Sequence, residues 1–150
     1  MRVLVQRVAQ AAVSIGGVVK SSIGHGMLVF VGIEEADGAE DIEWICGKLS
    51  KLRIFADENG IMNLDVGQVG GRILVVSQFT LYASTRKGNR PSYIRSAPES
   101  VSRPLYERFV ARLAEVAGRD IPTGEFGADM QVSLVNDGPV TIWIDSKNRE

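Results

Sequence analysis

One stretch of the sequence, from Ile73 to Tyr82, most constrains what this chain can fold into. It begins as the most β-prone apolar run of the chain, which predicts a buried strand. Polar residues then follow where burial would otherwise continue. If the segment stays extended, side chains alternate between faces, and Gln78, Thr80 and Tyr82 share one side. Because uncompensated polar side chains in a core strand cost free energy, the strand either ends in solvent or lines a site, and we favour a site.

The composition predicts one ordinary core and no strong electrostatic field. The 150 residues suit a single domain over residues 1–150, and 45% hydrophobic with 23% charged residues is typical of a soluble globular protein. The formal net charge of −1 gives no global basic field, so any contact with nucleic acid has to use a local patch. Cys46 is the only cysteine, which excludes an intramolecular disulfide and a cysteine-rich metal site. Its apolar helical surroundings favour a buried structural thiol over a nucleophile.

The apolar segments are too short for a membrane span. The longest strongly apolar run, Met27 to Ile33, is far below the roughly 20 residues that cross a bilayer. Charges interrupt the apolar start of the chain and no small-residue cleavage site follows, which argues against a signal peptide. We therefore expect a soluble, cytoplasmic protein.

Alternation and turn signals predict mostly strands. Gly16-Gly17 supplies the positive φ of a tight hairpin, and His25, the only histidine, lies between two glycines and is interpreted as a turn residue rather than a catalyst. Besides the stretch that starts at residue 73, strands are expected over residues 2–9, 12–15, 18–20, 27–33, 53–55, 130–135 and 140–144. The hairpin and meander favour a mainly antiparallel sheet over a doubly wound one, in an α/β chain of the α+β type.

Two helices are expected to cover this sheet. Asp37 followed by Glu40, and Ser96 followed by Glu99, resemble capping boxes at the two helix starts, and Gly118 is expected to end the second helix. Each helix carries one apolar stripe: Ile42, Ile45, Cys46, Leu49 and Leu52 in the first, and Leu105, Phe109, Leu113 and Val116 in the second.

The usual side-chain catalysts are scarce in this sequence. No serine stands in a nucleophile-elbow motif, both glycine-rich nucleotide-binding fingerprints are missing, and one histidine with one cysteine does not make a zinc site. Asp57, Glu58 and Asp65 fall in turn-like sequence and are expected to be solvated. If the protein is an enzyme, backbone amides, hydroxyls and the substrate itself must therefore carry most of the chemistry, with no metal or cofactor.

Two places remain for a site. In the first, Ser77 to Tyr82, the alternative is a strand end whose polar side chains bond neighbouring backbone. The second is Gly138-Pro139, where the sequence by itself favours a simple hairpin turn because Asp-Gly suits such turns. However, a proline directly after Asp137-Gly138 removes a ladder donor and allows a cis bond, which would present two carbonyls in a rigid way.

The two stretches together resemble a known family. Ser77-Gln78-Phe79-Thr80-Leu81 and Asn136-Asp137-Gly138-Pro139-Val140-Thr141 resemble the two signature motifs of the D-aminoacyl-tRNA deacylases. The opening Met1 to Val8, the loop Lys87 to Ser92 and the chain length are also similar to that family. The resemblance implies a homodimer with a sheet-based, barrel-like fold, an active site at the subunit interface, and tRNA as the partner.

The resemblance also implies roles for individual residues. Ser77, Gln78, Phe79 and Thr80 would form the floor of the catalytic pocket, with backbone N–H groups near Phe79 polarising the ester carbonyl. Thr80 is a tempting nucleophile, but no base is evidently placed to activate it, so we expect the 2′-hydroxyl of the terminal adenosine to assist. Met130 matches a position near the adenosine pocket, with plain core packing as the alternative.

Chiral selection would come from Gly138-Pro139. In the family this dipeptide is cis and reaches into the pocket of the partner subunit, where it blocks L-aminoacyl groups. D-aminoacyl and achiral glycyl esters are then hydrolysed, because a rigid backbone wall rejects the wrong enantiomer by a clash.

A basic loop completes the predicted substrate surface. Arg86, Lys87, Arg90 and Arg95 are expected to contact phosphates of the tRNA acceptor end, with a solvated loop as the alternative. The resulting hypothesis is a D-aminoacyl-tRNA deacylase that acts in chiral proofreading. Two other hypotheses are a non-catalytic module that shelters the acceptor end and a structural dimer without a ligand.

Overall fold

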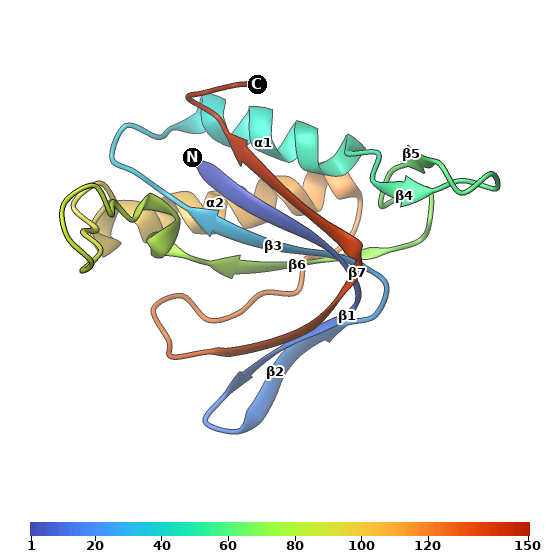
Figure 1. Cartoon of the computed structure of the whole chain (residues 1–150), viewed down its shortest axis with the longest axis horizontal. Helices are drawn as coiled ribbons and strands as arrows, with labels where there is room; N and C mark the ends of the chain where they lie inside the picture. The colour runs from blue at the N-terminus through green and yellow to red at the C-terminus, as the bar shows by residue number, and fades with distance from the viewer.

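The structure is a computed structural model that describes residues 1–150 (Figure 1). It consists of a curled sheet with two helices on one side and a small two-stranded sheet beside them. The elements are, in order, β1 (Arg2–Ile15), β2 (Val18–Ile23), β3 (Gly26–Gly32), α1 (Ala39–Lys51), β4 (Phe55–Ala56), β5 (Met62–Leu64), β6 (Arg72–Ser77), the 3₁₀ turn η1 (Phe79–Tyr82), α2 (Glu99–Ala117) and β7 (Gln131–Asp145). Neither α1 nor α2 combines the length and the apolar composition of a membrane-spanning helix.

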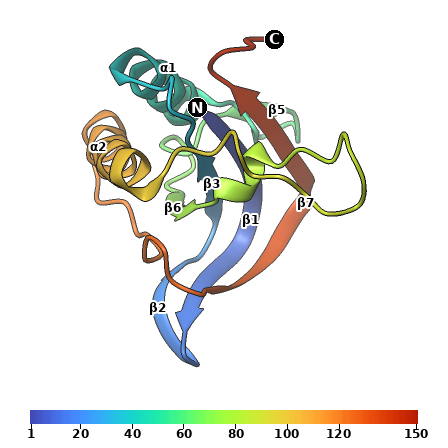
Figure 2. The same ribbon diagram turned by 90° about the vertical axis from the view of Figure 1, so that its left-hand side faces the viewer.

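Strand β1 is the centre of the large sheet. Its first half pairs with β3, its second half pairs with β2, and β7 pairs with it along both halves. All these pairings are antiparallel, and only β3 and β6 run parallel. Because β1 passes from one set of neighbours to another, it curves strongly and the sheet curls into a half barrel (Figure 2). The predicted α+β class with a mainly antiparallel, barrel-like sheet and two covering helices is confirmed.

Strand β7 corrects one expectation. The hairpin alternative for residues 136–139 is wrong, because the segments before and after them form one strand. Leu134 pairs with Ala11 and Ile142 pairs with Val5, so both halves of β7 run antiparallel to the same partner. Asn136 pairs with Val8 and Thr141 with Gln6, so the four residues 137–140 stand opposite a single residue of β1. Residues 137–140 therefore form a bulge inside a strand.

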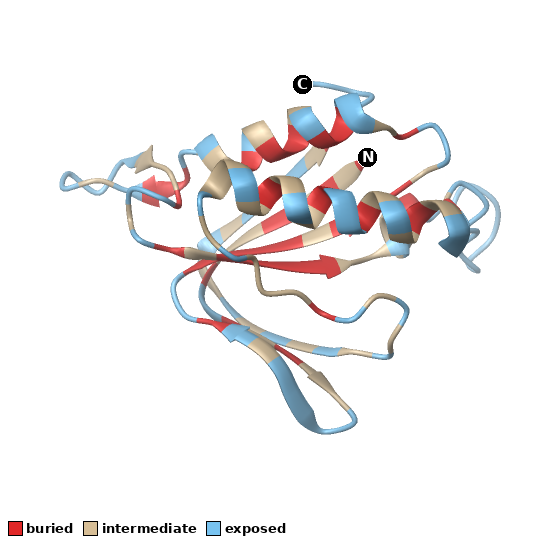
Figure 3. Cartoon of the chain, turned by 180° about the vertical axis from the view of Figure 1, so that it is seen from behind, coloured by how far each residue is buried: buried red, intermediate tan, exposed pale blue.

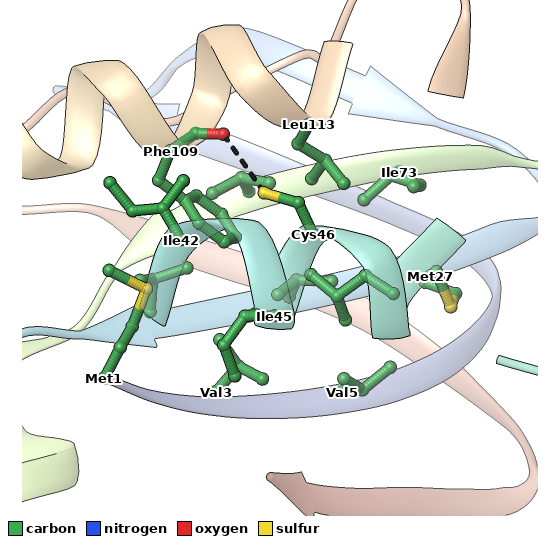
Figure 4. Packing of buried hydrophobic residues seen from close by; sticks show 14 of the residues in the cluster. Met1, Val3, Val5, Met27, Ile42, Ile45, Cys46, Ile73, Phe109 and Leu113 are labelled. Carbon is green, nitrogen blue, oxygen red and sulfur yellow. Dashed lines mark hydrogen bonds between the residues drawn. The ribbon is translucent and has the colours of Figure 1, made fainter. Parts of the chain in front are cut away.

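The larger hydrophobic core lies between the helices and one face of the sheet (Figures 3 and 4). The red inward faces of both helices in Figure 3 match the expected stripes. Ile42, Ile45, Cys46 and Leu49 are buried in α1, and Phe109 and Leu113 in α2. Leu52, Leu105 and Val116 pack against this core while remaining partly exposed. A second, smaller cluster fills the curl of the sheet below.

Both predicted capping boxes are wrong, for the same physical reason. Helix α1 starts after Gly38, whose N–H donates to Asp41 Oδ2 at 2.9 Å. Asp37 is instead buried, where it accepts hydrogen bonds from the amino group of Met1 and the N–H of Glu34. Helix α2 starts after Pro98 without a side-chain cap. In both cases the side chain that local spacing assigned to the cap forms a hydrogen bond with a residue distant in sequence. Asp37 accepts from the amino group of Met1, and Ser96 donates to the Phe79 carbonyl of η1.

Glycines are required at two kinds of position. Gly16 and Gly17 have φ of +56° and +80° and form the tight hairpin between β1 and β2, as predicted. Gly118 at φ +64° ends α2, also as predicted. At Gly26 the requirement is close approach instead, because a Cβ there would lie 1.9 Å from the carbonyl oxygen of Arg72. The parallel pairing of β3 with β6 depends on that contact.

Candidate active site

The site begins where β6 ends. The strand stops at Ser77, although the N–H of Gln78 still donates to the Val31 carbonyl at 2.7 Å, and η1 then turns the chain through Phe79–Tyr82. The predicted alternation is therefore wrong beyond Ser77. Tyr82 is 1% exposed and Phe79 is 57% exposed, which reflects the rotation of a 3₁₀ turn rather than the two faces of a strand.

Gly32 of β3 explains where η1 sits. A Cβ at Gly32 would lie 2.9 Å from Leu81 Cβ and 3.0 Å from the Gln78 carbonyl oxygen. The backbone of η1 therefore rests directly on β3 at a residue with no side chain. This close approach could not be recognised from the apolar run alone.

A pocket of about 320 Å³ lies beside the end of β6. Two stretches of the chain supply most of its lining: Ser77, Gln78 and Phe79 in the first, and residues 126–130 in the second. The remaining lining comes from β3 and the residue after it, from β6, from α2 and the segment before it, and from β7: Val31, Ile33, Val76, Ala97, Ser102 and Val132. Nine of the fourteen lining residues are hydrophobic, so the pocket suits a ligand with substantial apolar surface and few polar groups.

Four predicted residues come together at this pocket: Ser77, Gln78, Phe79 and Met130. Thr80 does not line the pocket. Its hydroxyl oxygen accepts a hydrogen bond from Gln78 Nε2 at 2.5 Å, which ties it to the first of the two lining stretches. An amide N–H donates a proton and cannot remove one, so this contact positions Thr80 without activating it as a nucleophile.

Residues 126–129 are the part of the lining that sequence reasoning missed. The Phe126 ring lies 5.5 Å from the ring of Tyr106, and the guanidinium of Arg103 lies 4.8 Å above it. Met130 Sδ accepts a hydrogen bond from the N–H of Glu125 at 3.4 Å, which folds the segment onto itself. The only signal in the sequence was an aromatic residue inside a glycine-containing loop, which many surface loops share.

Gly138-Pro139 lies elsewhere on the chain. The peptide bond is cis, as the resemblance implied, and both residues are exposed. Neither lines the pocket of its own chain. Figure 1 shows the bend of β7 on the right, far from the yellow-green segment that follows β6 on the left. The chain by itself therefore does not bring the two predicted halves of the site together.

The bulge is nevertheless held firmly. Arg7 Nε donates to the carbonyl oxygen of Asp137 at 2.9 Å and lies 3.5 Å from its carboxylate, while Nη1 donates to the Ile54 carbonyl at 2.5 Å. Asn136 Oδ1 accepts the N–H of Val140 at 2.8 Å, which closes the base of the bulge. Gly138 has a φ of +137°, a region that side chains disfavour.

The cationic side chains of the basic loop differ in whether they form an ion pair. Arg86, Lys87 and Arg90 are exposed and form no ion pair. Arg95 instead pairs with Glu34 at 3.2 Å and lies over the ring of Tyr82. Ser84 and Ser92 exchange backbone hydrogen bonds of 2.8 and 2.9 Å, which close the loop at its base.

The other reactive side chains lie outside the pocket. Cys46 is fully buried, and burial raises the pKa of its thiol to about 12, as expected of a structural thiol. The His25 ring packs edge-on against Phe55 at 5.1 Å, between β2 and β3. No group of three or more His, Cys, Asp or Glu side chains is arranged to hold a metal ion.

Comparison with known proteins identifies the family. Residues 4–145 match the family model described as D-Tyr-tRNA(Tyr) deacylase. D-aminoacyl-tRNA deacylases of Bacteroides thetaiotaomicron and Chromobacterium violaceum are each 61% identical over 150 residues, which is the full length of both chains compared. The chain therefore belongs to the D-Tyr-tRNA(Tyr) deacylase family, whose members are hydrolases.

Solved structures agree on the fold. A protein described as c-Myc DNA Unwinding Element Binding Protein superposes with a TM-score of 0.91 at 38% identity, covering 97% of this chain and 98% of that one. A probable eukaryotic D-amino acid tRNA deacylase superposes with a TM-score of 0.80 at 20% identity, covering 95% and 97%. The second likeness concerns the fold alone.

Proposed function

We propose that this protein hydrolyses the ester bond of D-aminoacyl-tRNA, and of mischarged glycyl-tRNA, to release the free amino acid and tRNA. One observation carries the proposal. The signature residues Ser77, Gln78 and Phe79 line a pocket in a chain that is 61% identical to deacylases over its full length. The proposed setting is chiral proofreading in the cytoplasm.

Backbone groups would stabilise the reacting carbonyl. The N–H groups of Phe79 and Thr80 open η1, and because the first N–H groups of a helical turn have no acceptor within it, they are available to an oxyanion that forms at the ester. Thr80, held by Gln78, would support this arrangement rather than attack the ester. The 2′-hydroxyl of the terminal adenosine would assist the hydrolysis. Undiminished hydrolysis of a substrate that ends in 2′-deoxyadenosine would reject that role.

Selection against L-aminoacyl groups would require a second copy of the chain. Gly138-Pro139 is exposed, anchored at its base by Arg7 and Asn136, and absent from the pocket of its own chain. These facts support a homodimer in which the bulge of one copy enters the pocket of the other. An anchored backbone cannot move aside as a side chain can, so it would exclude an L side chain while a D side chain points away.

The tRNA would extend from the pocket to the basic loop. Met130 and Phe126 form an apolar wall that suits the terminal adenosine, and the unpaired Arg86, Lys87 and Arg90 suit phosphates of the acceptor end. This footprint is local, which fits a chain with a net charge of −1.

The deciding experiment compares D-Tyr-tRNA with L-Tyr-tRNA. We expect release of D-tyrosine with L-Tyr-tRNA left intact. Equal rates on both would reject the proposed chirality, and binding of charged tRNA without turnover would favour a module that only shelters the acceptor end. Glycyl-tRNA should be cleaved as well, because it has no side chain to exclude.

A further inference from the structure

The last residue of η1, Tyr82, contacts two arginines. The buried ring of Tyr82 has the guanidinium carbon of Arg2 4.4 Å from its centroid and that of Arg95 at 5.4 Å. Tyr82 also donates its hydroxyl hydrogen bond to Glu34 Oε1 at 3.3 Å, and Glu34 pairs with Arg95. Side chains from β1, from the segment after β3 and from the basic loop thus meet on one ring.

Arg2 makes the most direct connection between this cluster and the pocket wall. Its Nη1 donates to the Leu81 carbonyl at 3.1 Å, and its Nε donates to Asp145 Oδ2 at 2.8 Å. Its guanidinium also lies 5.4 Å from the centroid of Trp143. Although burial acts to raise the pKa of Asp145, the hydrogen bonds from Arg2 and from the N–H of Lys147 hold it below its usual value, so this carboxylate stays ionised opposite Arg2. Arg2 therefore fixes a carbonyl of η1 to the end of β7.

A four-residue 3₁₀ turn has little stability of its own, because few of its hydrogen bonds are internal. Leu81 N–H donates to the Gln78 carbonyl at 3.2 Å and Ala83 N–H to the Thr80 carbonyl at 3.0 Å. External contacts must therefore set the orientation of η1. Arg2 holds its end at Leu81, and Ser96 Oγ donates to the Phe79 carbonyl at 2.8 Å at its beginning.

We infer that Arg2 is a positioning residue of the pocket, which aims the N–H groups of Phe79 and Thr80 without touching the substrate. Arg2 does not line the pocket, so its influence has to pass through the Leu81 carbonyl and the Tyr82 ring. Peptide groups in a short helical turn rotate together, and a small misorientation of catalytic donors costs rate rather than binding. The kinetic part of this inference rests on the proposed hydrolysis.

Arg149 offers a matched control. Like Arg2, it lies over an aromatic ring (Trp44, 4.7 Å), donates to a carbonyl (Ser146, 3.1 Å) and pairs with a carboxylate (Glu40, 3.4 Å). None of these residues lines the pocket or belongs to η1. Replacing either arginine by methionine removes the same three kinds of contact.

The kinetic test measures kcat and KM on D-Tyr-tRNA for Arg2→Met, Arg2→Lys and Arg149→Met, each below its own Tm. We expect Arg2→Met to lower kcat about 30-fold, within the roughly 100-fold that a misplaced catalytic group can cost, with KM changed less than about threefold. Arg2→Lys should recover part of kcat, because an ammonium can still donate to the Leu81 carbonyl. Arg149→Met should leave kcat within about twofold. An Arg2→Met enzyme with wild-type kcat would overturn the inference.

A second measurement does not depend on activity. Amide hydrogen exchange at Leu81 and Ala83, whose N–H groups each donate a hydrogen bond across η1, should become at least tenfold faster in Arg2→Met and stay unchanged in Arg149→Met. Unchanged exchange at both amides would also overturn the inference. If the wild-type protein fails to hydrolyse D-Tyr-tRNA, the proposed function falls, while the exchange result still decides whether Arg2 orders η1.

Discussion

The two signature segments of this chain interrupt strands in opposite ways. At the end of β6 the chain turns inward through η1 and leaves an apolar pocket of about 320 Å³ beside Ser77 and Phe79. In the middle of β7 the chain turns outward, and Gly138 and Pro139 protrude from a strand that then resumes on the same partner. One segment forms a recess and the other forms a projection.

Under the proposed function, this difference divides the work between the two segments. The recess has a mostly hydrophobic lining beside the first N–H groups of η1, whereas the projection has a held backbone and does not line the pocket of its own chain. In the proposed homodimer, the projection of one copy would enter the recess of the other. The following predictions test that division, starting with the largest expected effect.

The recess should collapse when η1 is displaced. In Gly32→Ala the new Cβ would meet Leu81 Cβ and the Gln78 carbonyl, so η1 has to move away from β3. We expect hydrolysis of D-Tyr-tRNA to fall by about 100-fold. Overpacking should also cost about 1–3 kcal/mol of unfolding free energy. Gly47→Ala is the control, because a Cβ there meets nothing within 4 Å. Full activity in Gly32→Ala would show that η1 need not rest on β3.

The projection should control selectivity rather than rate. In Gly138→Ala, a Cβ would lie 2.9 Å from Val140 Cγ2 and 3.0 Å from Arg7 Nη2, and a φ of +137° is unfavourable for alanine. We expect the ratio of D-Tyr-tRNA to L-Tyr-tRNA hydrolysis to fall at least tenfold, with the D rate retained within about fivefold. An unchanged ratio would contradict a role for the bulge in chiral selection.

Mixed subunits sharpen the same comparison. If the bulge acts in the partner's pocket, a heterodimer of Gly32→Ala and Gly138→Ala has one site with an intact recess and an intact projection. Random exchange of subunits, with half of the dimers mixed, should then give about a quarter of the sites wild-type selectivity and rate. If the bulge instead acted on the pocket of its own chain, no site in the mixture would be intact, and the mixture would show only the summed activities of the two variants.

The basic loop should affect binding by a smaller amount. In Lys87→Ala plus Arg90→Ala we expect KM for charged tRNA to rise about 5- to 10-fold, and the dependence of KM on salt to weaken, because two phosphate contacts are lost. Lys48→Ala plus Lys51→Ala removes the same charge from α1 and should change neither quantity. If binding is insensitive both to salt and to the loop variant, the loop does not contact the tRNA and is simply solvated.

Cys46 should take no part in the function of either segment, because its thiol is buried in the core. Its raised pKa means that the folded protein holds the thiol proton more tightly than the unfolded chain does. Stability should therefore be independent of this group below about pH 8.5 and decline as the pH rises above it. We expect the native thiol to resist alkylation at pH 8.5 and to react after denaturation. Rapid alkylation with loss of hydrolysis would place Cys46 in the site.

Local patterns predicted the parts of the fold that depend on neighbours in sequence. Gly16-Gly17, the stripe of α1 and the stop at Gly118 follow from backbone freedom and periodicity, which are properties of short segments. The caps at Asp37 and Ser96 were predicted wrongly, because each side chain has a partner far away in the chain. Periodicity carries no information about such partners.

The candidate site was predicted from its motifs, and its geometry was not. Ser77 to Phe79 and Met130 do meet at one pocket, but the end of β6 depends on the absence of a side chain at Gly32, and the continuity of β7 depends on pairing with β1. Phe126 belongs to a loop without periodicity, so only the three-dimensional fold brings it to the same pocket as Phe79.

The pairing of both halves of β7 with β1 has an evolutionary consequence. One residue gained or lost between Asn136 and Thr141 would leave their pairings with Val8 and Gln6 in place, but it would displace Gly138-Pro139 from the hydrogen bonds that Arg7 and Asn136 make to the bulge. The loop from residue 85 to residue 91 has no such constraint, because Ser84 and Ser92 close it independently of its length. Among related chains, insertions and deletions should therefore accumulate in that loop, whereas the β7 bulge should change its residues without changing its length.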